Sequence, residues 1–215
     1  MEDVSVPVRS VESAGPDAVA ITFETPDGFE GAPGQFVRLS ATIDGEVVQR
    51  FYTLSSPDVT ETFEVTVAVD PEGSLAPWLA VRDPGDTVTV SGPYGDHYYE
   101  REESVVVLAA GPGIGPAVAI GERAIDDGAS VAVVHPKDQS IHADRLSALD
   151  EAGAVLVTFA EDLEAAVATA VDDVGGTVFV YGFEGFVSDA AAALEAAGRD
   201  PEDAKIESFG PGPEA

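Results

Sequence analysis

Apolar and polar residues alternate along the chain from Val4 to Gly95. A period of two is typical of antiparallel strands with one face in a core and the other in water, and Pro, Gly and Asp residues separate the runs as turns. Six such strands are predicted, at Val4–Val8, Val19–Phe23, Phe36–Leu39, Val47–Leu54, Phe63–Val67 and Thr87–Val90. A short helix is predicted between the last two, over Ser74–Val81. This density of short strands indicates a small closed barrel.

The pattern changes after Ser104, where continuous runs of β-branched residues alternate with Ala- and Glu-rich helical segments. Such runs indicate parallel strands that are buried on both faces by helices. They lie at Val105–Leu108, Val131–Val134, Val155–Val157 and Val178–Tyr181, and Ile206–Gly210 supplies a fifth. The expected fold is therefore a six-stranded antiparallel barrel over residues 1–100, followed by a five-stranded parallel Rossmann-like sheet with helices on both faces over residues 101–215.

Charge and composition narrow the function classes. The 215 residues include 10 Lys and Arg against 40 Asp and Glu, a net charge of −30, which argues against a nucleic-acid partner. The chain has no cysteine, which excludes disulfides, thiolate metal sites and a protein-held iron–sulfur cluster. Its three histidines lack ligand-like spacing, so no metal site is predicted.

The location of the protein is inferred from what the sequence lacks. It has no apolar run of membrane-spanning length and an acidic start where a secretory signal is basic, so a cytoplasmic protein without a membrane span is expected. The acidity favours a salt-adapted cell, because a dense anionic shell keeps a protein soluble at high salt. The alternative is an acidic docking face for one basic partner.

Two segments of the barrel carry candidate binding chemistry. Strand alternation places Arg50 and Tyr52 on one face and Phe51 and Thr53 on the other, at the end of the fourth strand. A forked guanidinium suits a phosphate, and an aromatic ring suits a flat heteroaromatic ligand. Gly73–Leu79 leads into the short helix, whose free N–H groups suit a pyrophosphate.

Two turns of the second domain lie at carboxyl ends of parallel strands, where open sheets bind their ligands. Gly111-Pro112-Gly113-Ile114-Gly115-Pro116 follows the first parallel strand and opens a helix, although Pro116 stands where a dinucleotide fingerprint has its third glycine. Tyr181-Gly182-Phe183 follows the fourth strand.

The order and spacing of these segments resemble the ferredoxin reductase family of flavin- and pyridine-nucleotide-dependent oxidoreductases. Arg50-x-Tyr52-Thr53-x-x-Ser56, the Gly111–Pro116 turn and the terminal Glu207-x-Phe209 carry the resemblance, and Pro33–Phe36 and Ser91–Gly95 add to it. The resemblance covers nearly the whole chain. It implies bound FAD, NAD(P)H as co-substrate, and transfer of hydride between them.

The resemblance also implies roles for individual residues. Tyr52, Thr53 and Glu207 are expected at the catalytic centre, with Tyr52 against the isoalloxazine, the Thr53 hydroxyl near flavin N5 and Glu207 closing the site from the C-terminal side. Other positions are expected to bind the cofactors: Arg50 and Ser56 in the flavin motif, Gly73, Ser74, Leu75 and Ala76 along the FAD pyrophosphate, Gly111, Pro112, Gly113 and Ile114 along that of NAD(P)H, and Gly182 and Phe183 beside the nicotinamide.

This chain departs from the family at two of these positions, and those departures keep other functions open. Family members usually carry Ser or Thr where Ala76 stands, and commonly Cys-Gly-Pro where Tyr181-Gly182-Phe183 stands. The leading hypothesis is an NAD(P)H-dependent reductase that passes electrons to an external acceptor such as ferredoxin or free flavin. The alternatives are an electron-transfer subunit of a larger complex and a non-catalytic flavin-binding regulatory module.

Nucleotide preference depends on cations near the end of the second parallel strand. Lys137 and Arg145 follow that strand and are candidates to bind the 2′-phosphate of NADPH, although Asp138 and Asp144 are their neighbours. The sequence leaves the choice between NADH and NADPH open.

Overall fold

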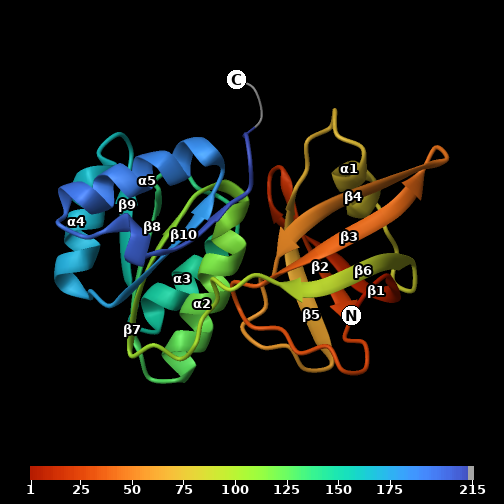
Figure 1. Cartoon of the computed structure of the whole chain (residues 1–215), viewed down its shortest axis with the longest axis horizontal. Coiled ribbons are helices and arrows are strands. Elements are labelled where there is room, and N and C mark those ends of the chain that lie inside the picture. The colour runs from red at the N-terminus through yellow and green to blue at the C-terminus, as the bar shows by residue number, and fades with distance from the viewer. Residues whose placement is uncertain (213–215) are drawn as a thin grey trace.

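The computed structural model describes residues 1–212, which form two sheets side by side along the long axis of the molecule (Figure 1). Residues 213–215, the end of the expected second domain, lie outside the described residues. The expected domain boundary at residue 100 falls within segment 95–103, which contains no strand or helix, and it stays a prediction.

The first sheet is antiparallel, with the strand order β4-β3-β6-β1-β2-β5. Its elements are β1 (Val4–Gly15), β2 (Ala18–Glu24), β3 (Phe36–Ile43), β4 (Glu46–Thr53), β5 (Thr62–Ala68), α1 (Leu75–Ala80) and β6 (Thr87–Tyr94). The six predicted strands are confirmed, and the short helix lies where it was expected. Strand β1 runs on to Gly15, beyond its apolar alternation, because Ser10 and Glu12 still pair with Thr22 and Ala20 of β2.

The two edge strands of this sheet meet only near its junction with the second sheet. Leu54, just after β4, bridges Val65 of β5, and the Ser55 N–H donates to the Glu64 carbonyl at 2.8 Å. The barrel therefore closes at one end, whereas the earlier part of β4 remains an edge strand. Its core is aromatic and aliphatic, with Phe63 packed against Phe23 and Phe29 at centroid distances of 5.2 and 4.9 Å.

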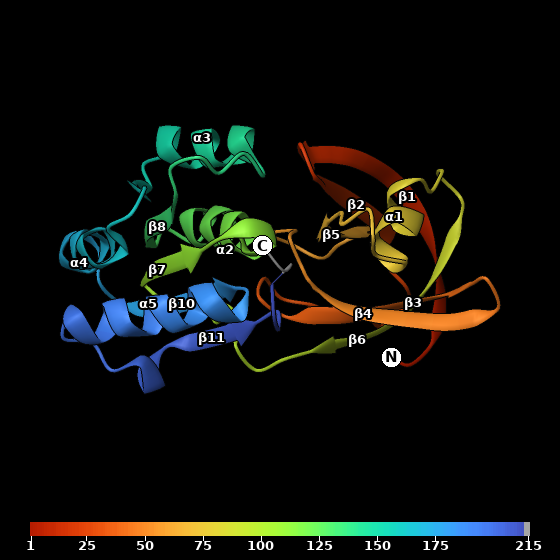
Figure 2. The same cartoon turned by 90° about the horizontal axis from the view of Figure 1, so that it is seen from above.

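The second sheet is parallel, with the strand order β11-β10-β7-β8-β9. Its elements are β7 (Ser104–Ala109), η1 (Gly111–Gly113), α2 (Ile114–Asp126), β8 (Ser130–Pro136), α3 (Ala143–Glu151), β9 (Val155–Phe159), α4 (Leu163–Asp173), β10 (Thr177–Gly182), α5 (Glu184–Ala196), η2 (Pro201–Asp203) and β11 (Lys205–Ser208). The predicted five-stranded parallel sheet is confirmed. Figure 2 shows the chain after β11 returning to the junction between the sheets.

Helices cover both faces of this sheet, which explains its continuous apolar strands. Val105 and Val107 of β7 belong to the core under α2 and α3, whereas Val106 and Leu108 belong to the core under α4 and α5. Both sets are fully buried. Because neighbouring residues of a strand point to opposite faces, a strand between two helix layers has no polar face.

Two glycines allow the start of α2 to approach its neighbours closely. A Cβ at Gly113 would overlap the backbone carbonyl of Tyr181 on β10, and one at Gly115 would overlap the Thr66 side chain on β5. The backbone carbonyl has no freedom to move aside. The glycine-rich turn therefore has a packing role, because it lets α2 contact both its own sheet and the barrel.

Replacing Gly113 by Ala is expected to destabilise the fold by about 2 kcal/mol or more, because the added methyl group would clash with the backbone carbonyl of Tyr181. The control is Gly185→Ala in α5, where the site is open and alanine favours the helix, so stability should be unchanged or slightly higher. Urea unfolding at high salt measures both. Equal stability of the two variants would contradict the packing role.

Candidate active site

A cleft of about 340 Å³ lies between the end of β4, the start of α1 and two turns of the second domain. It brings together sequence-distant parts of the chain at the junction of the two sheets. Its walls include nine of the predicted site residues: Arg50, Tyr52, Thr53, Gly73, Ser74, Leu75, Ala76, Pro112 and Phe183. Phe51, Thr66, Ala68, Asp70 and Phe209 also line it and were not among the predicted site residues.

Arg50 places a positive charge at the edge of this cleft. Its side chain is exposed, and its Nη1 donates to the Gln49 carbonyl at 2.7 Å. Six of the ten basic side chains pair with carboxylates within residues 1–212, and Arg50 is not one of them. A guanidinium without a carboxylate partner is notable in a chain of net charge −30, and it is available to an anionic ligand.

Tyr52 and Thr53 form the wall next to Arg50. Burial raises the pKa of Tyr52 to about 12, although Arg50 opposes the shift, so the phenol is neutral at physiological pH. The Thr53 side chain is 7% exposed. Strand alternation separates Thr53 from Arg50 and Tyr52, yet all three line the same cleft because β4 ends at the edge of the sheet.

The loop before α1 offers uncommitted polar groups. The Ser74 side chain does not cap α1, and Leu75 points into the barrel core. The carboxylate of Asp70 accepts a hydrogen bond from the Glu72 N–H at 2.9 Å within the same loop. Ser56 lies outside the cleft lining, and its hydroxyl accepts from the Glu64 N–H at 3.1 Å.

The opposite wall belongs to the second domain. The rings of Phe183 and Phe209 meet edge to face at 6.3 Å, and Pro112 lies with them in the cleft lining. Gly113 and Ile114 are buried, and neither they nor Gly111 and Gly182 line the cleft. The contact of these four residues with a cofactor stays a prediction.

Tyr181 and Glu207 lie behind this wall on neighbouring strands. Tyr181 is fully buried, and its hydroxyl donates to the His97 carbonyl in the segment that joins the sheets at 2.9 Å. Glu207 is half-buried and lies outside the cleft lining; burial raises its pKa, and His97 opposes the shift. Its catalytic role stays a prediction.

An ion cluster joins the two domains beside the cleft. Arg145 of α3 donates to Glu122 of α2 at 2.7 Å, to Glu64 of β5 at 3.1 Å and to the Ser55 carbonyl at 2.8 Å. Burial raises the pKa of Glu64, whereas Arg145 and the Ser55 hydroxyl oppose the shift. The hypothesis that Arg145 binds a 2′-phosphate is wrong for this arrangement, because three protein groups already occupy its guanidinium.

His142 makes a second contact between the domains. Its Nε2 shares a hydrogen bond of 2.7 Å with the hydroxyl of Thr66, which lines the cleft. The His142 N–H donates to the Ala14 carbonyl at 2.7 Å. Burial, followed by the charge of Arg145, lowers the pKa of His142 to about 4, so its ring is neutral at physiological pH.

The chain that forms this cleft is similar to known oxidoreductases. Residues 5–99 match the family model of the oxidoreductase FAD-binding domain. This match covers the barrel, from within β1 to the segment after β6. The chain is 38% identical to the glycine betaine monooxygenase reductase subunit of Chromohalobacter salexigens over 103 residues, which are 46% of this chain and 28% of the relative. Over 92 residues, or 40% of this chain and 37% of the relative, it is 39% identical to the flavodoxin/ferredoxin–NADP reductase of Escherichia coli. The matches thus span about a third of each relative's length.

Solved structures share the fold of the whole chain. The flavohem-like FAD/NAD-binding domain of nitric oxide dioxygenase from Vibrio cholerae superposes with a TM-score of 0.80 at 22% identity, covering 98% of this chain and all of that one. A ferredoxin NADP+ reductase from Neisseria gonorrhoeae with bound FAD and NADP gives 0.77 at 19% identity, covering 97% and 99%. The expected fold class is confirmed, and the match of residues 5–99 to an FAD-binding domain supports FAD as the cofactor.

Within residues 1–212, no group of three or more His, Asp or Glu side chains is arranged to hold a metal ion. No helix in the described part of the chain is both long and apolar enough to cross a membrane.

The buried His142 is expected to make stability depend on pH. Its folded pKa of about 4 lies below the ordinary 6.5, so the unfolded state binds the proton more tightly. The stability that this residue contributes is present above pH 6.5 and is lost as pH falls toward 4, by about 3 kcal/mol in all.

The matched variant is His142→Asn, because asparagine does not titrate and tolerates the left-handed backbone at φ 52°. Urea unfolding between pH 7 and 4 should show a shallower loss of stability in the variant than in the wild type. Parallel pH dependences would show that the His142 ring stays accessible to protons.

Proposed function

We propose that the chain is an NAD(P)H-dependent flavin reductase module, in which FAD occupies the cleft and electrons leave to an external acceptor such as ferredoxin or free flavin. The main support for the proposal is that residues of both domains line one cleft. Arg50, Tyr52 and Thr53 line it from the FAD-binding barrel, and Phe183 and Phe209 line it from the second domain.

The residues of the cleft fit a flavin dinucleotide. The guanidinium of Arg50 suits a phosphate, the neutral ring of Tyr52 supports a flat heterocycle, and the Ser74 hydroxyl is free of a capping bond. Ala76 lacks a hydroxyl, so its contact with the pyrophosphate is limited to the backbone N–H. The Asp70 carboxylate is the one negatively charged group among the lining residues, and it opposes anion binding.

When bound in the cleft, FAD would supply the redox chemistry, as the hydride acceptor for NAD(P)H. The protein supplies position and polarity. We assign Tyr52 to holding the plane of the flavin ring and the Thr53 hydroxyl to hydrogen bonding with flavin N5. Phe183 would border the nicotinamide, and Glu207, whose pKa burial raises, would close the site from the C-terminal side.

A second candidate function is the reductase component of a larger enzyme complex. It is favoured by the similarity of part of this chain to a reductase subunit of Chromohalobacter salexigens. The alternative of a non-catalytic regulatory module rests partly on the unusual Tyr181. This residue is fully buried, bonds the His97 carbonyl and does not line the cleft, so it gives no reason to expect loss of nucleotide use. Co-purification with a fixed partner would favour the second candidate.

Anaerobic titration of the FAD-loaded protein in high salt, first with NADPH and then with NADH, tests the reductase function. We expect the visible absorbance band of the bound flavin to bleach with at least one nucleotide. Bound flavin that stays oxidised with both would contradict reductase activity and favour a partner-fed or regulatory flavoprotein.

The same titration in single-turnover form tests Thr53. Thr53→Val is expected to slow flavin reduction about 100-fold with FAD still bound, because it removes a positioned hydrogen-bond donor. The control is Thr53→Ser, which keeps the hydroxyl and should retain most of the rate. An unchanged rate in the valine variant would remove Thr53 from the reaction.

We also propose that the acidic surface is an adaptation to high salt in the cytoplasm of its cell. The 40 carboxylates repel one another, and salt screens this repulsion. The Debye length falls from about 10 Å at 0.1 M salt to about 3 Å at 1 M, so the repulsion is much weaker at molar salt. The melting temperature should therefore rise by several degrees between low and molar KCl. A melting temperature that does not rise would contradict the adaptation and favour a docking role for the charge.

A further inference from the structure

We propose that Tyr181 is a positioning residue that sets the spacing between the two walls of the cleft, an inference that rests on the proposed reductase function. Tyr181 lies near the end of β10, two residues before Phe183 of the cleft lining. It is the largest fully buried side chain within residues 1–212, and it does not line the cleft. A buried side chain of this size behind the cleft wall needs a role other than contact with a cofactor.

The phenol ring of Tyr181 reaches the barrel side of the junction. Its hydroxyl donates to the His97 carbonyl at 2.9 Å, and burial raises the pKa of Tyr181 well above its ordinary value of 10, so the donor keeps its proton. A Cβ at Gly34 would lie 2.5 Å from the same hydroxyl, so the oxygen packs directly against the turn that precedes β3. The ring therefore bridges β10 of the second domain and a turn of the barrel.

The turn that Tyr181 contacts is bonded to the wall that carries Thr53. The carbonyl of Gln35, the residue after Gly34, accepts a hydrogen bond from the Leu54 N–H at 2.8 Å. Leu54 directly follows Thr53 and is fully buried in the barrel core. A displacement of this turn would therefore reach Thr53 through one hydrogen bond and one peptide unit.

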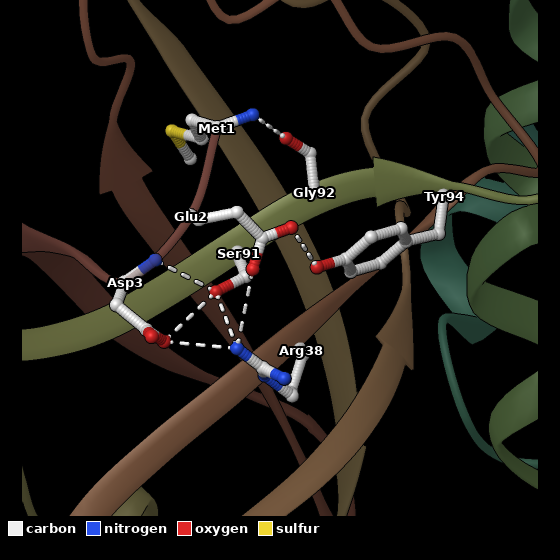
Figure 3. A network of polar contacts seen from close by, with 7 residues as sticks. All are labelled: Met1, Glu2, Asp3, Arg38, Ser91, Gly92 and Tyr94. Carbon is white, nitrogen blue, oxygen red and sulfur yellow. Dashed lines mark hydrogen bonds and ion pairs between the residues drawn. The ribbon is translucent and has the colours of Figure 1, made fainter.

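The segment that carries the His97 carbonyl is also fixed to the barrel. The side-chain Nε2 of Gln35 donates to the Gly95 carbonyl at 3.2 Å. Figure 3 shows the end of β6, which leads into this segment, held by the start of the chain, where the Tyr94 hydroxyl donates to Glu2 Oε1 at 2.7 Å. The hydrogen bond from β10 therefore ends on a carbonyl that the barrel holds in place.

Tyr181 is held equally firmly on the side of the second domain. Its backbone lies between Ala109 of β7 and Glu207 of β11, which are its register partners on the two neighbouring strands. Its carbonyl accepts from the Ala110 N–H at 3.2 Å, and its ring stacks with that of Phe179 at a centroid distance of 6.4 Å. A ring that is held at both ends acts as a spacer between the two domains.

Such a spacer controls the separation of Thr53 from Phe183. Reactions between positioned groups depend steeply on distance, and a misplacement of about 1 Å can cost about 100-fold in rate. Because Tyr181 does not line the cleft, a shorter side chain there changes the spacing and leaves every lining side chain in the protein. We therefore expect slower hydride transfer with unchanged affinity for FAD.

The spacing can be measured without any cofactor, because the chain has no cysteine and takes up spin labels only at introduced ones. Thr42→Cys on β3 and Glu195→Cys on α5 are exposed positions and place one label in each domain. Pulsed electron paramagnetic resonance then gives the distance between the labels in the apoprotein. Tyr181→Leu, which is too short to reach Gly34, is expected to broaden the distribution of that distance.

Single-turnover reduction of bound FAD at saturating NADPH or NADH gives the functional measurement. Tyr181→Leu is expected to slow this reduction about 100-fold and to leave the dissociation constant of FAD unchanged. Tyr181→Phe keeps the ring and loses only the bond to His97, so about a tenfold loss of rate is expected. The phenylalanine variant decides the question if the leucine variant does not fold.

Phe179→Leu is the matched control, because Phe179 is equally buried and lies on the same face of β10, farther from the cleft. It should leave the label distance and the rate unchanged, and thermal unfolding verifies that each variant folds. An unchanged label distance or an unchanged rate in the Tyr181 variants would overturn the positioning role with the proposed function intact, and so would equal effects in Phe179→Leu. A wild-type protein whose bound FAD neither nucleotide reduces would overturn the proposed function, and the positioning role with it.

Discussion

The cleft depends on the ion cluster around Arg145, which joins the two domains. One guanidinium contacts Glu122 of its own domain, and Glu64 and the Ser55 carbonyl of the barrel. The Arg145 side chain is 25% exposed, and those of Glu64 and Glu122 are similarly covered, so the charges are partly removed from water. Partly buried ion pairs contribute little net stability, but loss of one partner leaves uncompensated charge, which is strongly unfavourable. The cluster therefore holds the domains in one arrangement.

Several contacts around this cluster set the distance between the two walls of the cleft. His142 bonds Thr66 in the cleft itself, and Gly115 lets α2 approach the same threonine. On the other side of the joining segment, Lys205 donates to Glu102 at 2.6 Å and to the Tyr98 carbonyl at 2.7 Å, which ties β11 to that segment. Two domains fixed in this way can keep Thr53 and Phe183 facing one cavity, and hydride transfer demands such positioning.

Much of the fold could be predicted from the sequence, because strand alternation and continuous β-branched runs are local patterns. The flavin motif and the two turns could also be found, since spacing along the chain identifies them. Spacing does not show what a residue contacts. Arg145 resembles a phosphate ligand in sequence, yet its guanidinium already binds Glu64 of the other domain. Ile114 lies in a binding motif, but its side chain is buried in the core.

Other cleft residues were missed because no local signal marks them. Thr66 lies in an ordinary alternating strand, and only tertiary structure brings it to His142. Strand alternation predicts that Phe51 lies on the face opposite Arg50 and Tyr52, away from their ligand. At the end of an edge strand both faces are accessible to one ligand, so residues from both line one cleft.

The central claim is that FAD binds between the two walls while the Arg145 cluster holds the domains together. A crystal structure of the protein with FAD, grown at high salt, tests it most directly. The account predicts a flavin ring in contact with Tyr52 and Thr53, its phosphates at Arg50, and Arg145 still bound to Glu64 and Glu122. Flavin outside this cleft, or domains rotated apart with Arg145 released from Glu64, would contradict it.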